Sequence, residues 1–152
     1  MSGSKLRVKG RLVAEVRDAL TGALLATHAQ DNLVVDEGLN LLRDMLGDDR
    51  NKAPNYFYLG TNSTAAAPAD TVSTITSPFT KAFTARVRGS KAISFQTYIT
   101  AAEANGTTWT EAGLVNTYDG TSSLFARVAI TPIVKTAAVT VTFTWSITLS
   151  AA

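Results

Sequence analysis

The sequence contains no cysteine and a single histidine, His28. Without cysteine there is no disulfide, no thiolate metal site and no cysteine nucleophile, and one histidine cannot build a histidine cluster around a metal. Charged residues make up only 17% of the chain, and the net charge is +2. A chain this close to neutral is not held to nucleic acid by its overall charge. These absences exclude most enzyme classes, and we expect neither a metal nor a cofactor.

Long apolar runs are missing as well. No stretch approaches the roughly 18 consecutive apolar residues of a transmembrane helix. The basic N-terminus is not followed by the apolar run of about 7 to 15 residues that a signal peptide requires. We therefore expect a soluble chain made in the cytoplasm. Its 152 residues suffice for one domain.

The strongest positive signal is an alternation of apolar and polar residues near the C-terminus. From Val139 to Leu149, every odd position is apolar and every even position is Thr or Ser. This period of two predicts a half-buried strand with Trp145 on its apolar face. The polar face carries no charge, whereas monomers usually guard a free sheet edge with charges. The strand is therefore expected either in the middle of its sheet or under another chain.

Weaker alternation, bounded by turn residues, predicts further strands along the chain. They are expected at residues 6–17, 23–29, 55–59, 79–88, 93–99, 109–115 and 124–130. A turn is expected at Asp18–Gly22, and Asn105–Gly106 is a strong hairpin signal. Thr131–Pro132 is expected to end the penultimate strand. The small residues of segment 60–70 predict a mobile loop.

One helix is expected near residues 36–46. Leu39, Leu42 and Leu46 recur at helical spacing, Asp36 can cap the first turn, and Gly47 is the stop signal.

Many short strands with one short helix favour a mainly β fold. We expect an antiparallel β-sandwich or jelly roll of about eight strands. An extended N-terminal strand or arm, residues 1–17, is expected to precede a single β-sandwich body, residues 18–152.

Charge is distributed unevenly along the chain. Residues 1–17 contain five basic residues and one acidic residue, whereas residues 31–49 contain six acidic residues and one basic residue. Opposite charges on one small chain favour contact between copies, although the two segments could also pair within the chain or both remain solvated. The candidate partner-binding residues are Lys5, Arg7, Lys9, Arg11, Asp48 and Asp49.

No pattern of catalytic residues stands out. Glu103 and Glu111 flank the turn at Asn105 and could pair as glycosidase carboxylates do. A chain with 12 carboxylates offers many such pairs, however. His28 is expected to be an ordinary strand residue, and the acidic residues near Asp48 lack the calcium-loop spacing.

The order of several segments resembles a known family. The segments are Asp18–Gly22, Asn32–Leu42, Tyr58–Thr61, Thr110–Val115, Asp119–Gly120, Leu124–Val128, Ile133–Thr136 and the closing strand of alternating Thr, Phe and Trp. Together they resemble small virion structural proteins of tailed bacteriophages, described as head decoration (cement) proteins or as tail and tail-fibre components. The segment Thr71–Pro78 departs from the family pattern because it lacks an acidic residue and an Arg. The resemblance implies a β-sandwich or jelly-roll body, no enzyme activity and symmetric multimers.

The function expected from this resemblance is capsid decoration. Each copy would bridge neighbouring capsomers on the capsid surface of the virion and stabilise the expanded head. The expected partners are the major capsid protein and copies of the chain itself, with a homotrimer favoured. No small-molecule substrate, specific nucleic acid or membrane is expected. The basic N-terminal segment would reach a neighbouring subunit, so deleting Met1–Lys9 would abolish capsid binding and leave the body folded.

Two alternatives stay open. One is a tail or tail-fibre component of the same kind of virion. The other, from a different class, is a carbohydrate-binding β-sandwich with exposed Trp109, Tyr118 or Tyr98 as stacking platforms.

Overall fold

A computed structural model describes residues 5–118 and 122–151. This part of the chain contains nine strands and one α-helix, with short 3-10 turns at Arg50–Lys52 and Val72–Thr74. The elements are β1 (Leu6–Asp18), β2 (Leu24–Val34), α1 (Asp36–Leu46), β3 (Tyr56–Gly60), β4 (Phe79–Ala82), β5 (Ala85–Gly89), β6 (Ala92–Ile99), β7 (Thr107–Asn116), β8 (Ser123–Lys135) and β9 (Val139–Ala151).

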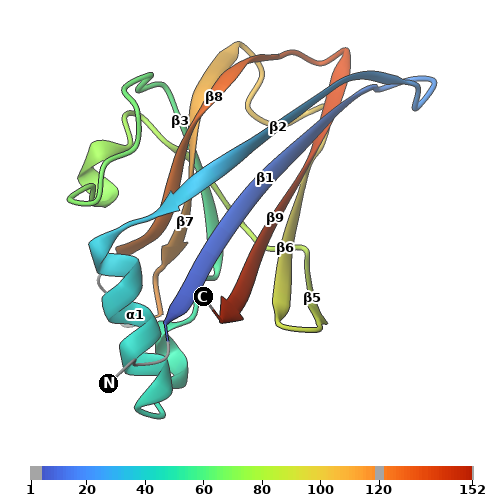
Figure 1. Cartoon of the computed structure of the whole chain (residues 1–152). Coiled ribbons are helices and arrows are strands. Elements are labelled where there is room, and N and C mark those ends of the chain that lie inside the picture. Colours follow the sequence, from blue (N-terminus) through green and yellow to red (C-terminus); the bar gives the residue numbers. More distant parts are fainter. Residues whose placement is uncertain (1–4, 119–121, 152) are drawn as a thin grey trace.

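The strands form one antiparallel sheet in the order β4-β3-β7-β8-β2-β1-β9-β6-β5. The sheet curls into a half-barrel, with α1 at one end (Figure 1). The prediction of a mainly β fold with one short helix is confirmed. The architecture differs from an eight-stranded sandwich or jelly roll, because the pairing of β2 with β8 joins all nine strands into a single sheet.

The N-terminal segment is a strand inside this sheet and not an extended arm. Residues 6–18 pair with β9 over their whole length, and residues 10–17 also pair with β2. The reason lies in the alternation of the segment, since Leu12, Ala14 and Val16 are buried on its inner face. β9 likewise lies in the middle of the sheet, between β1 and β6, which explains why its polar face needs no charge.

The curl brings the two edges of the sheet together at one point. β4 and β5 lie at opposite ends of the strand order, yet only Phe83 and Thr84 separate them in sequence. The backbone N–H of Thr84 donates to Gln96 O (2.7 Å), and Thr97 Oγ1 donates to Ala82 O (2.9 Å). These bonds fasten the end of β4 to β6. The predicted strand 79–88 is therefore split into two strands on opposite edges.

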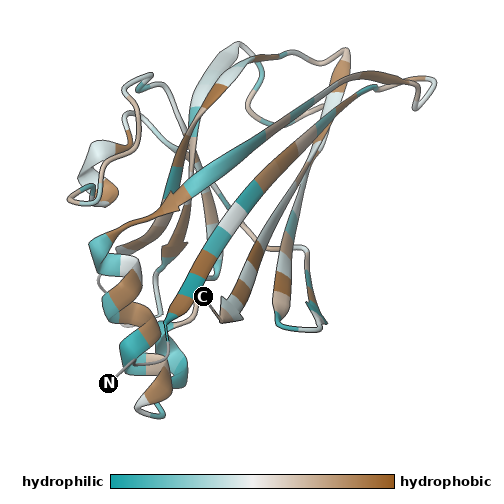
Figure 2. Cartoon of the chain, in the orientation of Figure 1, coloured by the Kyte–Doolittle hydropathy of each residue, from teal (hydrophilic) through white to brown (hydrophobic). Residues whose placement is uncertain are grey.

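The inner face of the curled sheet holds the main core. Brown and teal bands alternate along β1 in Figure 2, as expected for a strand with one buried face. Phe143 and Trp145 of β9 are fully buried, and the indole N–H of Trp145 donates to Asn32 Oδ1 (2.9 Å). Fully burying a large apolar side chain contributes about 1.5–3 kcal/mol. The period of two in the sequence therefore identified the core face of β9 correctly.

The helix spans the predicted residues but starts differently. Val35 is the N-cap and makes no side-chain cap bond, so Asp36 is the first helical residue and not the cap. The next carboxylate, Glu37, accepts a hydrogen bond from the backbone N–H of Leu124 (2.9 Å), which ties the start of α1 to β8. A Cβ on Gly38 would lie 2.0 Å from Phe125 O, so only glycine permits this approach. Gly47 ends the helix, as predicted.

Two strand predictions need correction. Asn105–Gly106 does not connect a hairpin, because β6 pairs with β5 and β9 whereas β7 pairs with β3 and β8. The chain instead crosses here from one half of the sheet to the other. β8 continues through Pro132 to Lys135, because the proline lies at an irregularity in the register with β7, where no ladder hydrogen bond is required of it.

Candidate functional site

An apolar groove of about 630 Å³ opens at the end of the half-barrel where α1 lies. One wall is α1, with Leu42 and Met45, and the opposite wall is the hairpin of β5 and β6. The start of β1 and the end of β9 lie at the same end of the molecule (Figure 1). Its apolar floor includes Val8, Ile93, Phe95, Phe125, Ile147 and Leu149.

The groove exists because the helix covers only part of the inner face. α1 packs on β8 near Gly38 and leaves the neighbouring ends of β6 and β9 open. Val8, Ile93 and Leu149 are consequently only partly buried. Concave, largely apolar surfaces with a few polar groups are typical of binding sites.

Three basic residues line the groove on its β5–β6 side: Arg86, Arg88 and Lys91. Arg86 pairs with Phe95 and Arg88 with Ile93 in the strand register, so both arginines share the concave face. Arg88 and Lys91 are exposed and have no side-chain partner among the described residues. The two arginines also protect β5 from pairing with another strand, because inward-facing charges guard a sheet edge.

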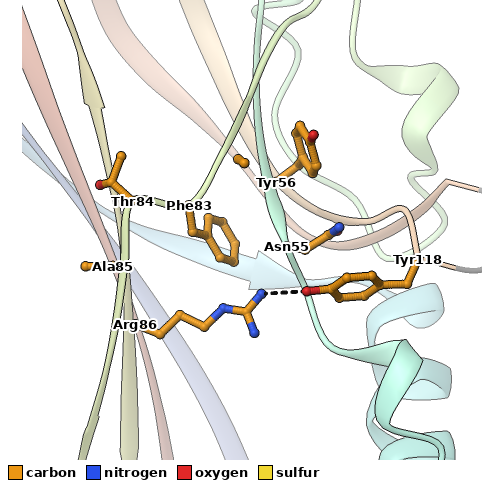
Figure 3. A pocket seen from close by; sticks show the side chains of 8 residues that line it. Asn55, Tyr56, Phe83, Thr84, Ala85, Arg86 and Tyr118 are labelled. Carbon is orange, nitrogen blue, oxygen red and sulfur yellow. Dashed lines mark hydrogen bonds between the residues drawn. The ribbon is translucent and has the colours of Figure 1, made fainter.

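Arg86 is already used within the fold. Its guanidinium donates to Pro54 O (3.0 Å) and to the Tyr118 hydroxyl (3.3 Å), and it lies over the Phe83 ring, 5.4 Å from the centroid. Figure 3 shows these side chains pointing toward one another across a second, smaller hollow. Asn55 lines the same hollow, and its amide is bonded to Thr117. Only Arg88 and Lys91 are therefore free to bind a carboxylate in the groove.

Three of the predicted basic residues, Arg7, Lys9 and Arg11, lie along the exposed face of β1, and Lys5 directly precedes the strand. Lys5, Arg7 and Lys9 are exposed, and none of them forms an ion pair with another described residue. Arg11 is paired with Asp31 at 3.0 Å, with both side chains largely exposed. Such a pair contributes little, about 0–1 kcal/mol. The first three cations therefore remain available to a partner.

The predicted acidic residues lie in the turn that follows α1. Asp48 is exposed at a φ of 71°, and its carboxylate is 3.9 Å from Arg50 Nε. The carboxylate of Asp49 accepts a hydrogen bond from the backbone N–H of Asn51 and so caps the 3-10 turn at Arg50–Lys52. The wider acidic segment 31–49 does not form one patch, since Asp31 faces Arg11 and Glu37 is bonded to β8.

The structure contains a buried ionic cluster that the sequence pattern does not predict. Arg127 and Glu111 are both fully buried, and Arg127 Nε donates to Glu111 Oε1 (2.9 Å). Arg127 also donates to Asp70 (3.0 Å) and to two backbone carbonyls of the 61–64 segment. The second oxygen of Glu111 accepts the N–H groups of Asn62 and Thr76. The loop predicted to be mobile is thus anchored on the outer face of the sheet.

The two carboxylates considered as a catalytic pair have separate structural roles. Glu111 belongs to the Arg127 cluster, whereas Glu103 is paired with Lys81 at 2.6 Å. The hydrogen bond from Lys81, and a further one from the Thr100 N–H, lower the pKa of Glu103 in spite of partial burial. Neither carboxylate therefore faces an open site together with the other.

A second buried cation also went unpredicted. Lys135 is fully buried and donates to Ala101 O, Asn105 Oδ1 and Thr136 O. Burial lowers the pKa of Lys135, and the charge of Glu103 partly opposes this effect. The contacts hold the crossing segment around Asn105 against the end of β8.

The aromatic residues proposed as stacking platforms are in different environments. Trp109 is fully buried beside Phe79 and Phe143, so it cannot stack on a ligand at the surface. Tyr98 and Tyr118 are exposed. Tyr118 lines the smaller hollow beside Arg86. His28 is a half-buried residue of β2.

Across residues 5–118 and 122–151, no three His, Asp or Glu side chains gather as metal ligands would. The one α-helix in this part of the chain is too short to cross a membrane.

Comparisons with protein-family models, with curated proteins and with solved structures found no match.

Proposed function

We propose that this chain is a non-enzymatic structural protein of a tailed-phage virion that decorates the capsid surface. The order of its sequence segments supports this role. The start of β1 supports it as well, because it has a basic outer face and an apolar inner face. Arg7 and Lys9 on the outer face of the strand, and Lys5 directly before it, are exposed cations without an ionic partner among the described residues, while Val8 on the inner face lines the apolar groove. This combination, which is the observation that carries the proposal, suits a protein that attaches to another protein surface.

The mechanism is attachment to an assembled shell. The basic face of β1 meets acidic groups of the major capsid protein, and each copy bridges neighbouring capsomers. The site between capsomers would exist only in the expanded shell, so the decoration protein would bind the expanded head and not the compact precursor. Such binding stabilises the expanded state by mass action. A trimer of copies would suit a threefold position of the shell.

Deletion of Met1–Lys9 is a poor test of this role. Leu6 to Lys9 pair with Thr148 to Ala151 of β9, and Val8 packs against the core. The deletion would remove part of the sheet together with the charges. Substitutions on the exposed face separate the two effects.

The test is co-sedimentation of the purified protein with expanded heads, with compact precursor heads and with tails of the parent phage. We expect saturable binding to expanded heads alone, lost in K5E/R7E/K9E and kept in the charge-preserving control K5R/R7K/K9R. Binding to tails alone would favour a tail component. Binding to neither would contradict the virion role.

A carbohydrate-binding role is the second candidate. It rests on the exposed ring of Tyr118 beside the hollow of Figure 3. Specific binding on a glycan array, lost in Tyr118→Ala, would favour this role over decoration.

A further inference from the structure

The turn after α1 exposes a large apolar side chain next to two carboxylates. Leu46 is 81% exposed, and Asp48 and Asp49 follow it after Gly47. We call these three residues the acidic tip. An isolated exposed leucine is common on protein surfaces. A leucine beside two carboxylates, at the mouth of a groove with free cations, is a more specific arrangement.

The groove has the complementary character. Its floor is apolar, its free side chains are the cations Arg88 and Lys91, and no acidic residue lines it. An occupant that satisfies this surface has an apolar side chain for the floor and carboxylates for the β5–β6 side. Charge complementarity of this kind sets partner choice and association rate.

The acidic tip does not fill the groove of its own chain. Leu42 and Met45 line the groove, whereas Leu46 is 81% exposed and does not line it. Leu46 follows Leu42 by about one helical turn, so it continues the groove-facing side of α1 beyond the groove. Its exposed side chain is therefore available to another molecule.

We propose that the acidic tip of a second copy of this chain docks in the groove. Leu46 of one copy covers the apolar floor near Ile147, and its two carboxylates meet Arg88 and Lys91 of the other. The tip and the groove adjoin at one end of the molecule, so two copies can exchange tips, or several can close into a ring. The proposal stands apart from the virion role, because it concerns the isolated protein.

Association of the purified protein, measured by sedimentation velocity and light scattering over a wide range of concentration, tests the proposal. The wild type should self-associate, more weakly at high salt. Leu46→Ser should raise the dissociation constant about tenfold or more, the size expected for losing a buried leucine. The matched control is Leu20→Ser, because Leu20 is 97% exposed in the turn between β1 and β2.

A charge exchange makes the test specific for the two surfaces. R88E/K91E and D48K/D49K should each lose self-association, because like charges then meet. The quadruple variant restores opposite charges and should associate again. Circular dichroism shows whether each variant is folded.

Three results would overturn the proposal. One is a wild type that stays monomeric at all concentrations. The second is association that R88E/K91E and Leu46→Ser leave unchanged. The third is a folded quadruple variant that stays monomeric. The head-binding assay is separate, so the failure of one proposal is distinguishable from the failure of the other.

Discussion

Removing the carboxylate of Glu111 should be among the most destabilising single changes in this protein. Glu111→Ala deletes an acceptor that bonds Arg127 Nε at 2.9 Å, the Asn62 N–H at 2.6 Å and the Thr76 N–H at 3.0 Å. Arg127 remains fully buried, with Asp70 as its remaining carboxylate. The loop 61–78 loses two of its attachments to the sheet.

The size of the effect follows from burial. Breaking a buried ion pair by removing one partner costs about 3–5 kcal/mol, because an uncompensated charge is left behind. Water can partly satisfy the two released N–H groups, so we do not add a full penalty for each. For a domain of this size, a loss of about 3–5 kcal/mol lowers Tm by roughly 6–20 °C.

Urea denaturation followed by tryptophan fluorescence measures this change. The exposed Arg11–Asp31 pair supplies the control, and Arg11→Ala should cost no more than about 1 kcal/mol. The double variant E111L/R127L should be more stable than Glu111→Ala alone, since it removes the fully buried guanidinium together with its partner and leaves only Asp70, which is partly exposed and keeps the hydrogen bond from the Ala67 N–H. A loss below about 1 kcal/mol in Glu111→Ala would refute the account of this cluster.

Three further predictions concern the packing of the helix at Gly38, the loss of stability at low pH and the burial of the two tryptophans. Gly38→Ala should destabilise the protein by about 2 kcal/mol or more in thermal melts, because the added Cβ would clash with the backbone of β8. Gly89→Ala is the control: its Cβ would make only an ordinary contact with Ala92, at 3.9 Å, so stability should change by less than about 0.5 kcal/mol. The hydrogen bond from Lys81 lowers the pKa of Glu103 below its ordinary value of 4.5. The ionised Glu103 therefore stabilises the folded state above pH 4.5, and this contribution is lost as the pH falls through the lowered pKa. Urea titrations at falling pH should therefore show a steeper loss in the wild type than in Glu103→Gln, and equal slopes would contradict this. Both tryptophans are fully buried, so iodide should quench their fluorescence only after unfolding.

The alternation of apolar and polar residues predicted the strands, and the helical spacing of the leucines predicted the helix. The apolar face of β9 and the bounds of α1 follow from side-chain pattern alone, because each pattern reports which residues can be buried together. Sheet order does not follow from pattern. The strand 79–88 reads as continuous, and only the curl of the whole sheet explains why its halves lie on opposite edges.

The buried ions could not be found from sequence either. Arg127 and Lys135 look like exposed strand residues, because cations are seldom buried without partners. Several of their partners, such as Asp70 and Asn105, come from loops that are distant in sequence. Of the candidate binding surfaces, the exposed charged residues can be predicted from the sequence and the groove cannot. The exposure of Lys5 and Asp48 follows from their charge, whereas the groove is a product of where α1 lies on the sheet.

The central claim is that the exposed basic start of β1, with Lys5, Arg7 and Lys9, is the face that meets an assembled head. Amide hydrogen exchange of the free protein and of the protein bound to expanded heads tests this claim most directly. We predict slower exchange in residues 5–10 on binding, with the turn at residues 18–24 unchanged. Protection confined to that turn or to the loop 61–78, with no change at the start of β1, would contradict it.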